Sequence, residues 1–122
     1  MHKLLVVDDD IEACDFLKRF FEKKDFQVFV ANDGENAVSL VKKKRPDIIL
    51  LDIKMPGQSG MKVLQEIKEI DKKSKVIMMT GIEEDTVIEL AREYGATGYI
   101  IKPFSLEYLE NDIMPKILEE LI

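Results

Sequence analysis

Four short apolar runs constrain most strongly what this chain can fold into. They occupy residues 4–7, 48–51, 76–79 and 99–101 and contain no charged side chain. Continuous runs of this length are typical of strands that are buried on both faces, as in a parallel sheet. A fifth segment, residues 26–31, includes a glutamine among its apolar residues and is predicted to be an edge strand.

Helical periodicity fills the segments between these runs and the segment after the last one. Apolar residues recur there at spacings of three and four, which predicts five amphipathic helices that alternate with the strands. This alternation is typical of an α/β fold in which a doubly wound parallel sheet lies between two layers of helices, a three-layer sandwich. The predicted buried faces are Ile11, Cys14, Leu17, Phe20 and Phe21; Ala37, Val38 and Val41; Val63, Leu64, Ile67 and Ile70; Val87, Leu90, Ala91 and Tyr94; and Leu106, Leu109, Ile113, Ile117 and Leu121.

Residues with special backbone preferences mark the predicted helix ends. Asp and Ser side chains accept hydrogen bonds from the first turn of a helix, and glycine often follows its last turn. Pro115 predicts a kink or a break in the last helix, because proline donates no hydrogen bond and its ring crowds residue 111. The expected N-caps are Asp10, Asp33, Ser59 and Ser105, and the expected C-terminal glycine is Gly95.

The length and charge of the chain exclude several classes of protein. A chain of 122 residues predicts one domain, over residues 1–122, and 46% apolar residues suffice for a buried core. The net charge of −6 argues against direct binding to nucleic acid or to an anionic membrane. No apolar run approaches the roughly 18–20 residues of a membrane span. The lone cysteine, Cys14, is expected to be buried and unpaired, which fits a reducing, cytoplasmic compartment.

Polar side chains stand directly after four of the five predicted strands. In a doubly wound sheet the functional crevice lies at the carboxyl ends of the strands, so these side chains are expected to converge. They are Asp8, Asp9 and Asp10 after the first strand, Asp52 after the third, Thr80 after the fourth, and Lys102 with Pro103 after the fifth.

The chemistry of this set indicates a metal and a phosphoryl group. Carboxylates packed together repel one another unless a cation compensates for their charge. Hard oxygen ligands favour Mg²⁺, with Mn²⁺ as an alternative, and Mg²⁺ characteristically joins carboxylates to a phosphoryl group. A lysine and a threonine hydroxyl nearby supply the cation and the hydrogen-bond donor that phosphoryl transfer also needs.

These motifs closely resemble the receiver domains of bacterial two-component response regulators, over essentially the whole chain. The most specific stretch is residues 50–57, Leu-Leu-Asp-Ile-Lys-Met-Pro-Gly, with Gly60 following. The opening residues 5–10 and the closing residues 102–104 stand at the expected strand ends. The resemblance implies a flavodoxin-like fold, similar to that of chemotaxis regulators, with strand order 2-1-3-4-5.

By this resemblance Asp52 is the phosphoacceptor. It would take a phosphoryl group from a phosphohistidine of a sensor kinase or of a histidine phosphotransfer protein, or from a small donor such as acetyl phosphate. Asp9 and Asp52 would bind Mg²⁺ directly, together with the backbone carbonyl of Lys54, whereas Asp8 would act largely through water. The chain would then be a signalling domain that catalyses its own phosphorylation and slow autodephosphorylation, not an enzyme with a separate substrate.

The resemblance also implies a switch between two conformations. Phosphorylation adds roughly 1.5–2 negative charges at the acceptor. Thr80 and Lys102 would contact phosphoryl oxygens, and Tyr99 would turn into the space that Thr80 vacates. This would change the surface of the fourth helix, the fifth strand and the fifth helix, where a downstream protein would bind. The peptide bond between Lys102 and Pro103 is expected to be cis.

Two further positions are expected to set the lifetime of the phosphorylated state. In the family, the residues two positions after the acceptor and two after the threonine flank the path of the hydrolytic water. Here they are Lys54 and Ile82. Ile82 offers no polar group to orient a water molecule and Lys54 would cover the phosphoryl group, so slow self-dephosphorylation is expected.

The task of the domain stays open between two alternatives. A phosphorelay intermediate would pass the phosphoryl group on to a second histidine protein, whereas an output regulator would bind a target through its switch surface. The segment before Tyr99, residues 95–98, lacks the acidic pair that many DNA-binding regulators carry. Their symmetric activation dimer and a transcriptional output are therefore not expected.

Three other classes of protein fit the sequence less well. A phosphohydrolase of the haloacid dehalogenase type would need a Thr or Val after its first acidic pair and would leave residues 52–60 unexplained. A flavodoxin-like flavin carrier would need a hydroxyl- and glycine-rich phosphate loop where three acids stand. A pseudo-receiver that binds partners without phosphorylation would not need the complete set of site residues that this chain has.

Overall fold

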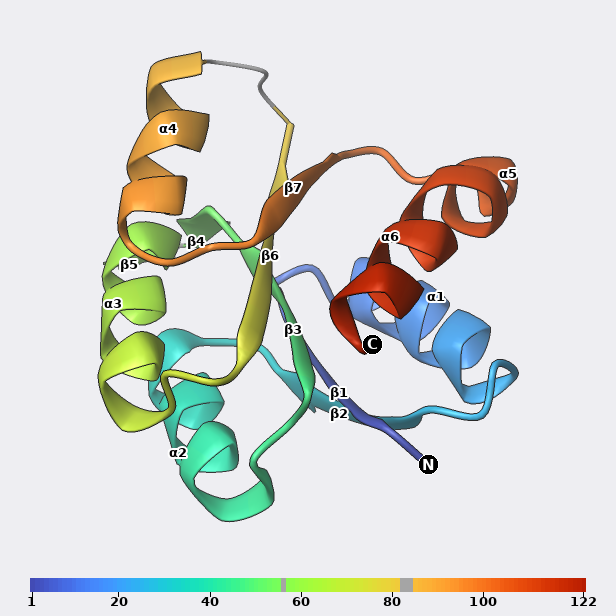
Figure 1. Cartoon of the computed structure of the whole chain (residues 1–122), viewed down its shortest axis with the longest axis horizontal. Coiled ribbons are helices and arrows are strands. Elements are labelled where there is room, and N and C mark those ends of the chain that lie inside the picture. Colours follow the sequence, from blue (N-terminus) through green and yellow to red (C-terminus); the bar gives the residue numbers. More distant parts are fainter. Residues whose placement is uncertain (56, 82–84) are drawn as a thin grey trace.

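In the computed structural model, which describes residues 1–55, 57–81 and 85–122, a five-stranded parallel sheet forms the centre of the molecule (Figure 1). Its order, β2-β1-β3-β6-β7, confirms the predicted arrangement 2-1-3-4-5 and the edge position of the second strand. The strands are β1 (Lys3–Val7), β2 (Gln27–Ala31), β3 (Ile48–Asp52), β6 (Lys75–Thr80) and β7 (Gly98–Ile101).

Helices cover both faces of this sheet, as the alternation of elements predicts. In Figure 1, α2, α3 and α4 lie on one side, and α1, α5 and α6 lie on the other. Among the described residues, no helix has both the length and the apolar character that crossing a membrane requires. The helices are α1 (Ile11–Glu22), α2 (Gly34–Lys44), α3 (Gly60–Ile70), α4 (Asp85–Glu93), α5 (Leu106–Tyr108), the π-helical turn η1 (Leu109–Ile113) and α6 (Met114–Glu120).

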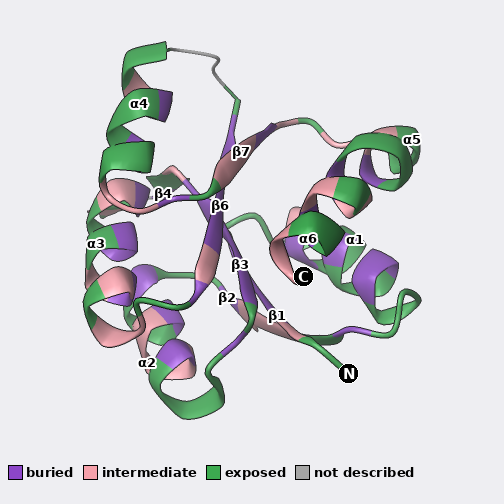
Figure 2. Ribbon diagram, in the orientation of Figure 1, coloured by how far each residue is buried: buried purple, intermediate pink, exposed green. Residues whose placement is uncertain are grey.

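The continuous apolar runs are explained by burial on both faces of the sheet. Along β1, Leu4 and Val6 pack with α1 and the C-terminal helices, whereas Leu5 and Val7 pack with α2 and α3. All four side chains are fully buried, and Figure 2 shows the buried central strands together with the inward faces of the helices. Successive residues of the strand point into the two cores in turn, so a polar side chain at any of these positions would be buried.

The predicted helix caps are confirmed. The side chains of all four expected N-cap residues accept hydrogen bonds from backbone amides of the first turn. At the end of α4, Gly95 has φ of +103°, the amide of Ala96 donates to the carbonyl of Ala91 at 2.9 Å, and the amide of Gly95 donates to Arg92 at 3.0 Å. This is a Schellman motif, in which a left-handed residue closes the helix.

Pro115 interrupts the last helix in a specific form. The five residues before α6 form the π-helical turn η1, in which the amide of Met114 donates to the carbonyl of Leu109. Pro115 then lies in the first turn of α6, where its missing N–H needs no partner within the helix. The predicted break is therefore accommodated by one wide turn.

Three residues assigned to buried faces are exposed, which corrects the prediction. Ile11 and Leu106 have exposed fractions of 65% and 59%. Each is the first residue of its helix, and helical side chains tilt toward the N-terminus, so these two project beyond the core. In α4, Ile88 and Ala91 are buried and Leu90 is 38% exposed. The helix is thus rotated relative to the predicted stripe, with its small alanine against the sheet.

A short hairpin that the sequence pattern did not predict follows β3. Its strands are β4 (Lys54–Met55) and β5 (Gln58–Ser59), which pair in antiparallel fashion, and Gly57 has φ of +78°. Directly after it, Gly60 begins α3 so close to β3 that a Cβ atom there would lie 2.1 Å from the carbonyl oxygen of Asp52. Only glycine lets the chain turn back this tightly next to the end of β3.

Candidate functional site

Three carboxylates meet at the carboxyl edge of the sheet. Asp8 and Asp9 follow β1, and Asp52 is the last residue of β3, the strand next to β1. One oxygen from each of these side chains lies within 4.8 Å of the others. The predicted convergence of the acids is therefore present in the structure.

Asp8 is the most buried member of this acidic cluster, which comprises Asp8, Asp9 and Asp52. Its side chain is fully buried. Its Oδ1 accepts a hydrogen bond from the amide of Asp10 at 3.0 Å, and its Oδ2 accepts one from Nζ of Lys102 at 2.5 Å. Both oxygens thus have a donor, which a buried carboxylate requires.

Asp52 lies beside Asp8 and shares its lysine. Its Oδ2 is 3.4 Å from Nζ of Lys102, and its Oδ1 accepts a hydrogen bond from the amide of Lys54 at 3.2 Å. Burial and the negative charge of Asp8 raise the pKa of Asp52 to about 6, although Lys102 and the Lys54 amide act in the opposite direction. Without a further cation, the cluster therefore holds Asp52 in an unfavourable electrostatic environment.

Lys102, which directly follows the edge strand β7, forms ion pairs with Asp8 and Asp52. Burial disfavours its charged form, but its hydrogen bond to Asp8 and the charge of Asp52 outweigh this and raise the pKa of Lys102. Its backbone amide donates to the carbonyl of Thr80 at 2.8 Å, and the peptide bond to Pro103 is cis. Thr80, the last residue of β6, is 6% exposed and lies at the same edge.

Tyr99 lies outside the acidic cluster, on the edge strand β7. It is half-buried and packs against the core on the side of α2, α3 and α4. Lys116 of α6 reaches it from the other side: its Nζ donates to the Tyr99 carbonyl at 3.2 Å and is 5.5 Å from the centre of the ring. Tyr99 also lines a small cavity together with Ile88 and Ala91 of α4.

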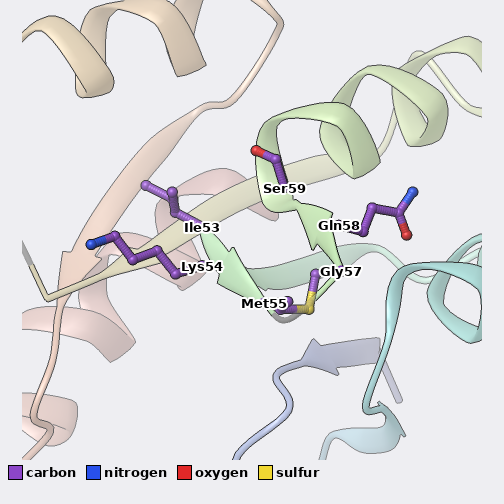
Figure 3. Close-up of a pocket in the computed structure, with 6 residues that line it drawn as sticks. All are labelled: Ile53, Lys54, Met55, Gly57, Gln58 and Ser59. Atoms are coloured by element: carbon purple, nitrogen blue, oxygen red, sulfur yellow. The ribbon is translucent and has the colours of Figure 1, made fainter.

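Of the two residues that are expected to affect the lifetime of the phosphorylated state, Lys54 and Ile82, the structure describes only Lys54. Lys54 is exposed in the hairpin that follows Asp52, and Ile82 lies outside the described residues. In Figure 3 the Lys54 side chain extends away from the hairpin on the side opposite Gln58. An open hollow of about 630 Å³ borders this hairpin, and its lining residues, Ile53, Lys54, Met55, Gly57, Gln58 and Ser59, include no member of the acidic cluster.

Two residues contact the cluster without having been predicted to do so. Nδ2 of Asn32 donates to the backbone carbonyl of Asp8 at 2.9 Å, and Sγ of Cys14 lies 3.3 Å from the same oxygen. Cys14 is buried and unpaired, as expected, and burial and the charge of Asp8 raise the pKa of its thiol to about 11. Asn32 directly follows β2, so it also stands at the carboxyl end of a strand. The same position that predicts the acids as site residues could therefore have predicted Asn32.

The donor set of the cluster fits a hard divalent cation. Among the described residues, the site brings together three carboxylates and the ammonium group of Lys102. Asp9 is exposed to solvent, whereas Asp8 and Asp52 are buried. Mg²⁺ is bound by one or two carboxylates and keeps several waters, so a half-open arrangement of this kind suits it.

Comparisons with known proteins agree with this geometry. The model of the response regulator receiver domain family matches residues 4–114. The sporulation initiation phosphotransferase F of Bacillus subtilis is 37% identical over 111 residues, which cover 91% of this chain and 90% of that protein.

Solved structures with the same fold come from several bacteria. A two-component response regulator from Clostridium difficile superposes with a TM-score of 0.90 at 29% identity, covering 99% of this chain and 96% of that one. A chemotaxis protein of Vibrio cholerae superposes with a TM-score of 0.88 at 27% identity, covering 100% and 99%. With a family match over nearly its whole length and an acidic cluster at the expected strand ends, this chain belongs to the family of response regulator receiver domains.

Proposed function

We propose that this receiver domain is a phosphorylation-dependent switch that accepts a phosphoryl group on Asp52 from a histidine residue of a partner protein. The observation that carries this proposal is the position of Asp52. Its carboxylate lies beside two other acids, within reach of Lys102 and next to the end of β6, where Thr80 stands. These are the groups that a phosphoryl group needs around it for in-line transfer.

The residues of the site have distinct tasks in this transfer. One carboxylate oxygen of Asp52 attacks phosphorus, the P–N bond to the donor histidine breaks, and the released imidazole takes up a proton. Lys102 and Thr80 stabilise the charge of the phosphoryl oxygens. Asp8, Asp9 and Asp52, with the Lys54 carbonyl, would hold Mg²⁺, which neutralises charge on both the acids and the phosphoryl group.

A surface for the donor protein lies beside the cluster, on the side of α1. Three apolar side chains are exposed there: Ile11 and Phe16 in α1, and Leu106 at the start of α5. Phe16 borders a pocket of about 290 Å³, whose lining residues are Asp10, Glu12, Ala13, Phe16, Lys102, Pro103 and Phe104. Exposed apolar residues around a polar site are typical of a protein interface, and a partner that binds here brings its histidine close to Asp52.

Between a relay and an output role, the comparison with the Bacillus subtilis protein favours the relay. That relative is named as a phosphotransferase, and it matches this chain over 90% of its own length. We therefore infer that the phosphoryl group passes on from Asp52 to a second histidine protein. An output role through the surface of α4, β7 and α5 is the alternative, and the contact of Tyr99 with both α4 and Lys116 favours a change on that surface.

Phosphorylation by acetyl phosphate tests the acceptor. With Mg²⁺ the intact mass of the wild-type protein is expected to rise by one phosphoryl group, and a chelator is expected to prevent this. Asp52→Asn is expected to abolish the gain because it removes the nucleophile. Asp112→Asn, which changes an exposed acid in η1, is the matched control and is expected to behave like the wild type. Phosphorylation of Asp52→Asn would refute the assignment.

The charge of the cluster predicts how stability depends on pH. Because the pKa of Asp52 in the folded protein is raised to about 6, the folded state binds more protons than the unfolded state between about pH 4 and pH 6. The contribution of Asp52 to stability therefore falls as the pH rises through this window. Without metal at pH 7, Asp52→Asn is expected to be more stable than the wild type by about 2 kcal/mol.

Urea unfolding in the presence of a chelator, at several pH values, measures this difference. The advantage of Asp52→Asn should grow from about pH 4 to about pH 6 and then stay constant. Added Mg²⁺ should stabilise the wild type more than the variant, because the variant lacks one ligand. A variant that is less stable than the wild type at pH 7 would contradict the proposed repulsion.

The partner surface is tested by comparing two phosphoryl donors. Ile11→Ser is expected to slow transfer from a phosphorylated histidine protein about tenfold, because it removes an apolar contact from the interface. Transfer from acetyl phosphate, which needs no protein interface, is expected to be unchanged. Leu118→Ser alters a similarly exposed leucine of α6 and serves as the control. Equal loss with both donors would mean that Ile11 acts on the site itself.

The lifetime of the phosphorylated state tests the role of the residues that flank the acceptor. Phosphoprotein labelled at Asp52 is expected to decay over minutes or longer, and Lys54→Ala is expected to shorten its half-life by opening access to water. Lys62→Ala, at an exposed position of α3, should leave the decay unchanged. Decay of the wild type within seconds would rule out slow self-dephosphorylation.

A further inference from the structure

We propose that Asn32 is a positioning residue of the acidic cluster: its amide fixes the peptide between Asp8 and Asp9 and thereby sets the affinity of the site for Mg²⁺. This inference rests on the proposed metal site, but it concerns a residue outside the acids, the lysine and the threonine. Four contacts around the Asp8 peptide carry the argument.

The Asn32 side chain extends the sheet by one rung. The pairing of β1 with β2 ends with Val7 opposite Ala31, and the amide of Asp8 still donates to the Ala31 carbonyl at 3.1 Å. One residue further on, Nδ2 of Asn32 donates to the carbonyl of Asp8 at 2.9 Å. The side-chain amide thus supplies the donor that a further strand residue would supply, at the point where the two chains diverge.

A second donor reaches the same carbonyl from α1. Sγ of the buried Cys14 lies 3.3 Å from the Asp8 oxygen and 3.6 Å from Nδ2 of Asn32. A thiol is a weak donor, whereas an amide is a strong one. Asn32 therefore supplies most of the stabilisation of this carbonyl, and the neighbouring Cys14 adds a second, weaker donor.

The orientation of this peptide matters because of Asp9. Asp8 is held through its own side chain by the Asp10 amide and by Lys102. Asp9, in contrast, is exposed, and within residues 1–55, 57–81 and 85–122 no hydrogen bond or ion pair holds its carboxylate. Its position is set by the backbone that precedes it, so the donors on the Asp8 carbonyl determine where the Asp9 carboxylate points.

Loss of the Asn32 amide should therefore weaken metal binding without removing a ligand. With only the thiol left, the Asp8–Asp9 peptide gains freedom, and the site has to order Asp9 when the cation binds. Groups that orient metal ligands typically contribute tenfold or more to metal affinity. We expect the Kd for Mg²⁺ to rise about tenfold in Asn32→Ala.

Titration of the metal-free, unphosphorylated protein with MgCl₂, followed by backbone amide NMR, measures this affinity. The same spectra report whether each variant is folded. Asn36→Ala is the matched control: it removes a nearby exposed asparagine whose Nδ2 donates to Asp33 at 2.9 Å and not to the Asp8 carbonyl. Its Kd for Mg²⁺ is expected to equal that of the wild type.

A rescue variant separates positioning from a general loss of structure. In Asn32→Ala combined with Cys14→Ser, the hydroxyl at position 14 is a stronger donor than the thiol, so part of the lost affinity should return. A destabilising change in the loop would not be repaired by this second substitution. A double variant that binds Mg²⁺ no better than Asn32→Ala would overturn the role of the Asp8 carbonyl.

The remaining outcomes distinguish this inference from the proposed function. Wild type that binds Mg²⁺, with Asn32→Ala binding equally well, would overturn the inference and leave the phosphorylation site intact. Wild type that does not bind Mg²⁺ would overturn the metal site itself, and this inference with it. A tenfold loss confined to Asn32→Ala supports both.

Discussion

The parallel register of the sheet is the constraint on which the site depends. β1 and β3 pair so that Val7 lies opposite Leu51, and the next residues along these two strands are Asp8 and Asp52. Two acids thus become neighbours through one further step of a ladder whose register is fixed by apolar residues on both faces. A shift of one residue in either strand would move an acid into the core and separate the pair. The geometry of the site is therefore set by the same side chains that stabilise the fold.

This arrangement keeps the cluster under electrostatic strain that the fold itself does not relieve. Burial, and then the charge of Asp8, raise the pKa of Asp52, and one lysine serves both acids at distances of 2.5 and 3.4 Å. A site built for stability alone would hold neutral or fully paired groups here. The excess negative charge of the acidic cluster over Lys102 is explained if the site binds a cation together with a phosphoryl group, because the cation compensates for the charge of both.

Much of the fold and most of the site followed from the sequence, and the exceptions have identifiable causes. Apolar runs and helix caps are local signals, and together they show where the strands end. Because functional residues of a doubly wound sheet lie at the carboxyl ends of its strands, these signals predict Asp8, Asp52 and Lys102 as site residues. The hairpin after Asp52 cannot be predicted, because strands of two residues have no period to detect. Periodicity places Ile11 in the core because it does not show where a helix extends past the sheet. Asn32 gives no signal of its role, because a single polar residue after a strand usually belongs to a turn.

In the proposed switch, the donor protein binds on the α1 side of the sheet and the conformational response occurs on the α4 side. Lys102 contacts the acidic cluster and directly follows the strand next to α4, so it can couple the two sides. The strand order reverses between β1 and β3, so the helices that follow these strands, α1 and α3, cover opposite faces, and the acids stand at the junction. A donor protein on the side of α1 and a response at α4 are separated by the sheet. Lys102 directly follows β7, and yet it pairs with Asp8 at the distant end of β1, across β3 and β6. In the proposed switch, a phosphoryl group on Asp52 would compete with Asp8 for this ammonium group. A resulting shift of Lys102 would act on β7, the strand that carries Tyr99 three residues earlier, beside α4 and Lys116.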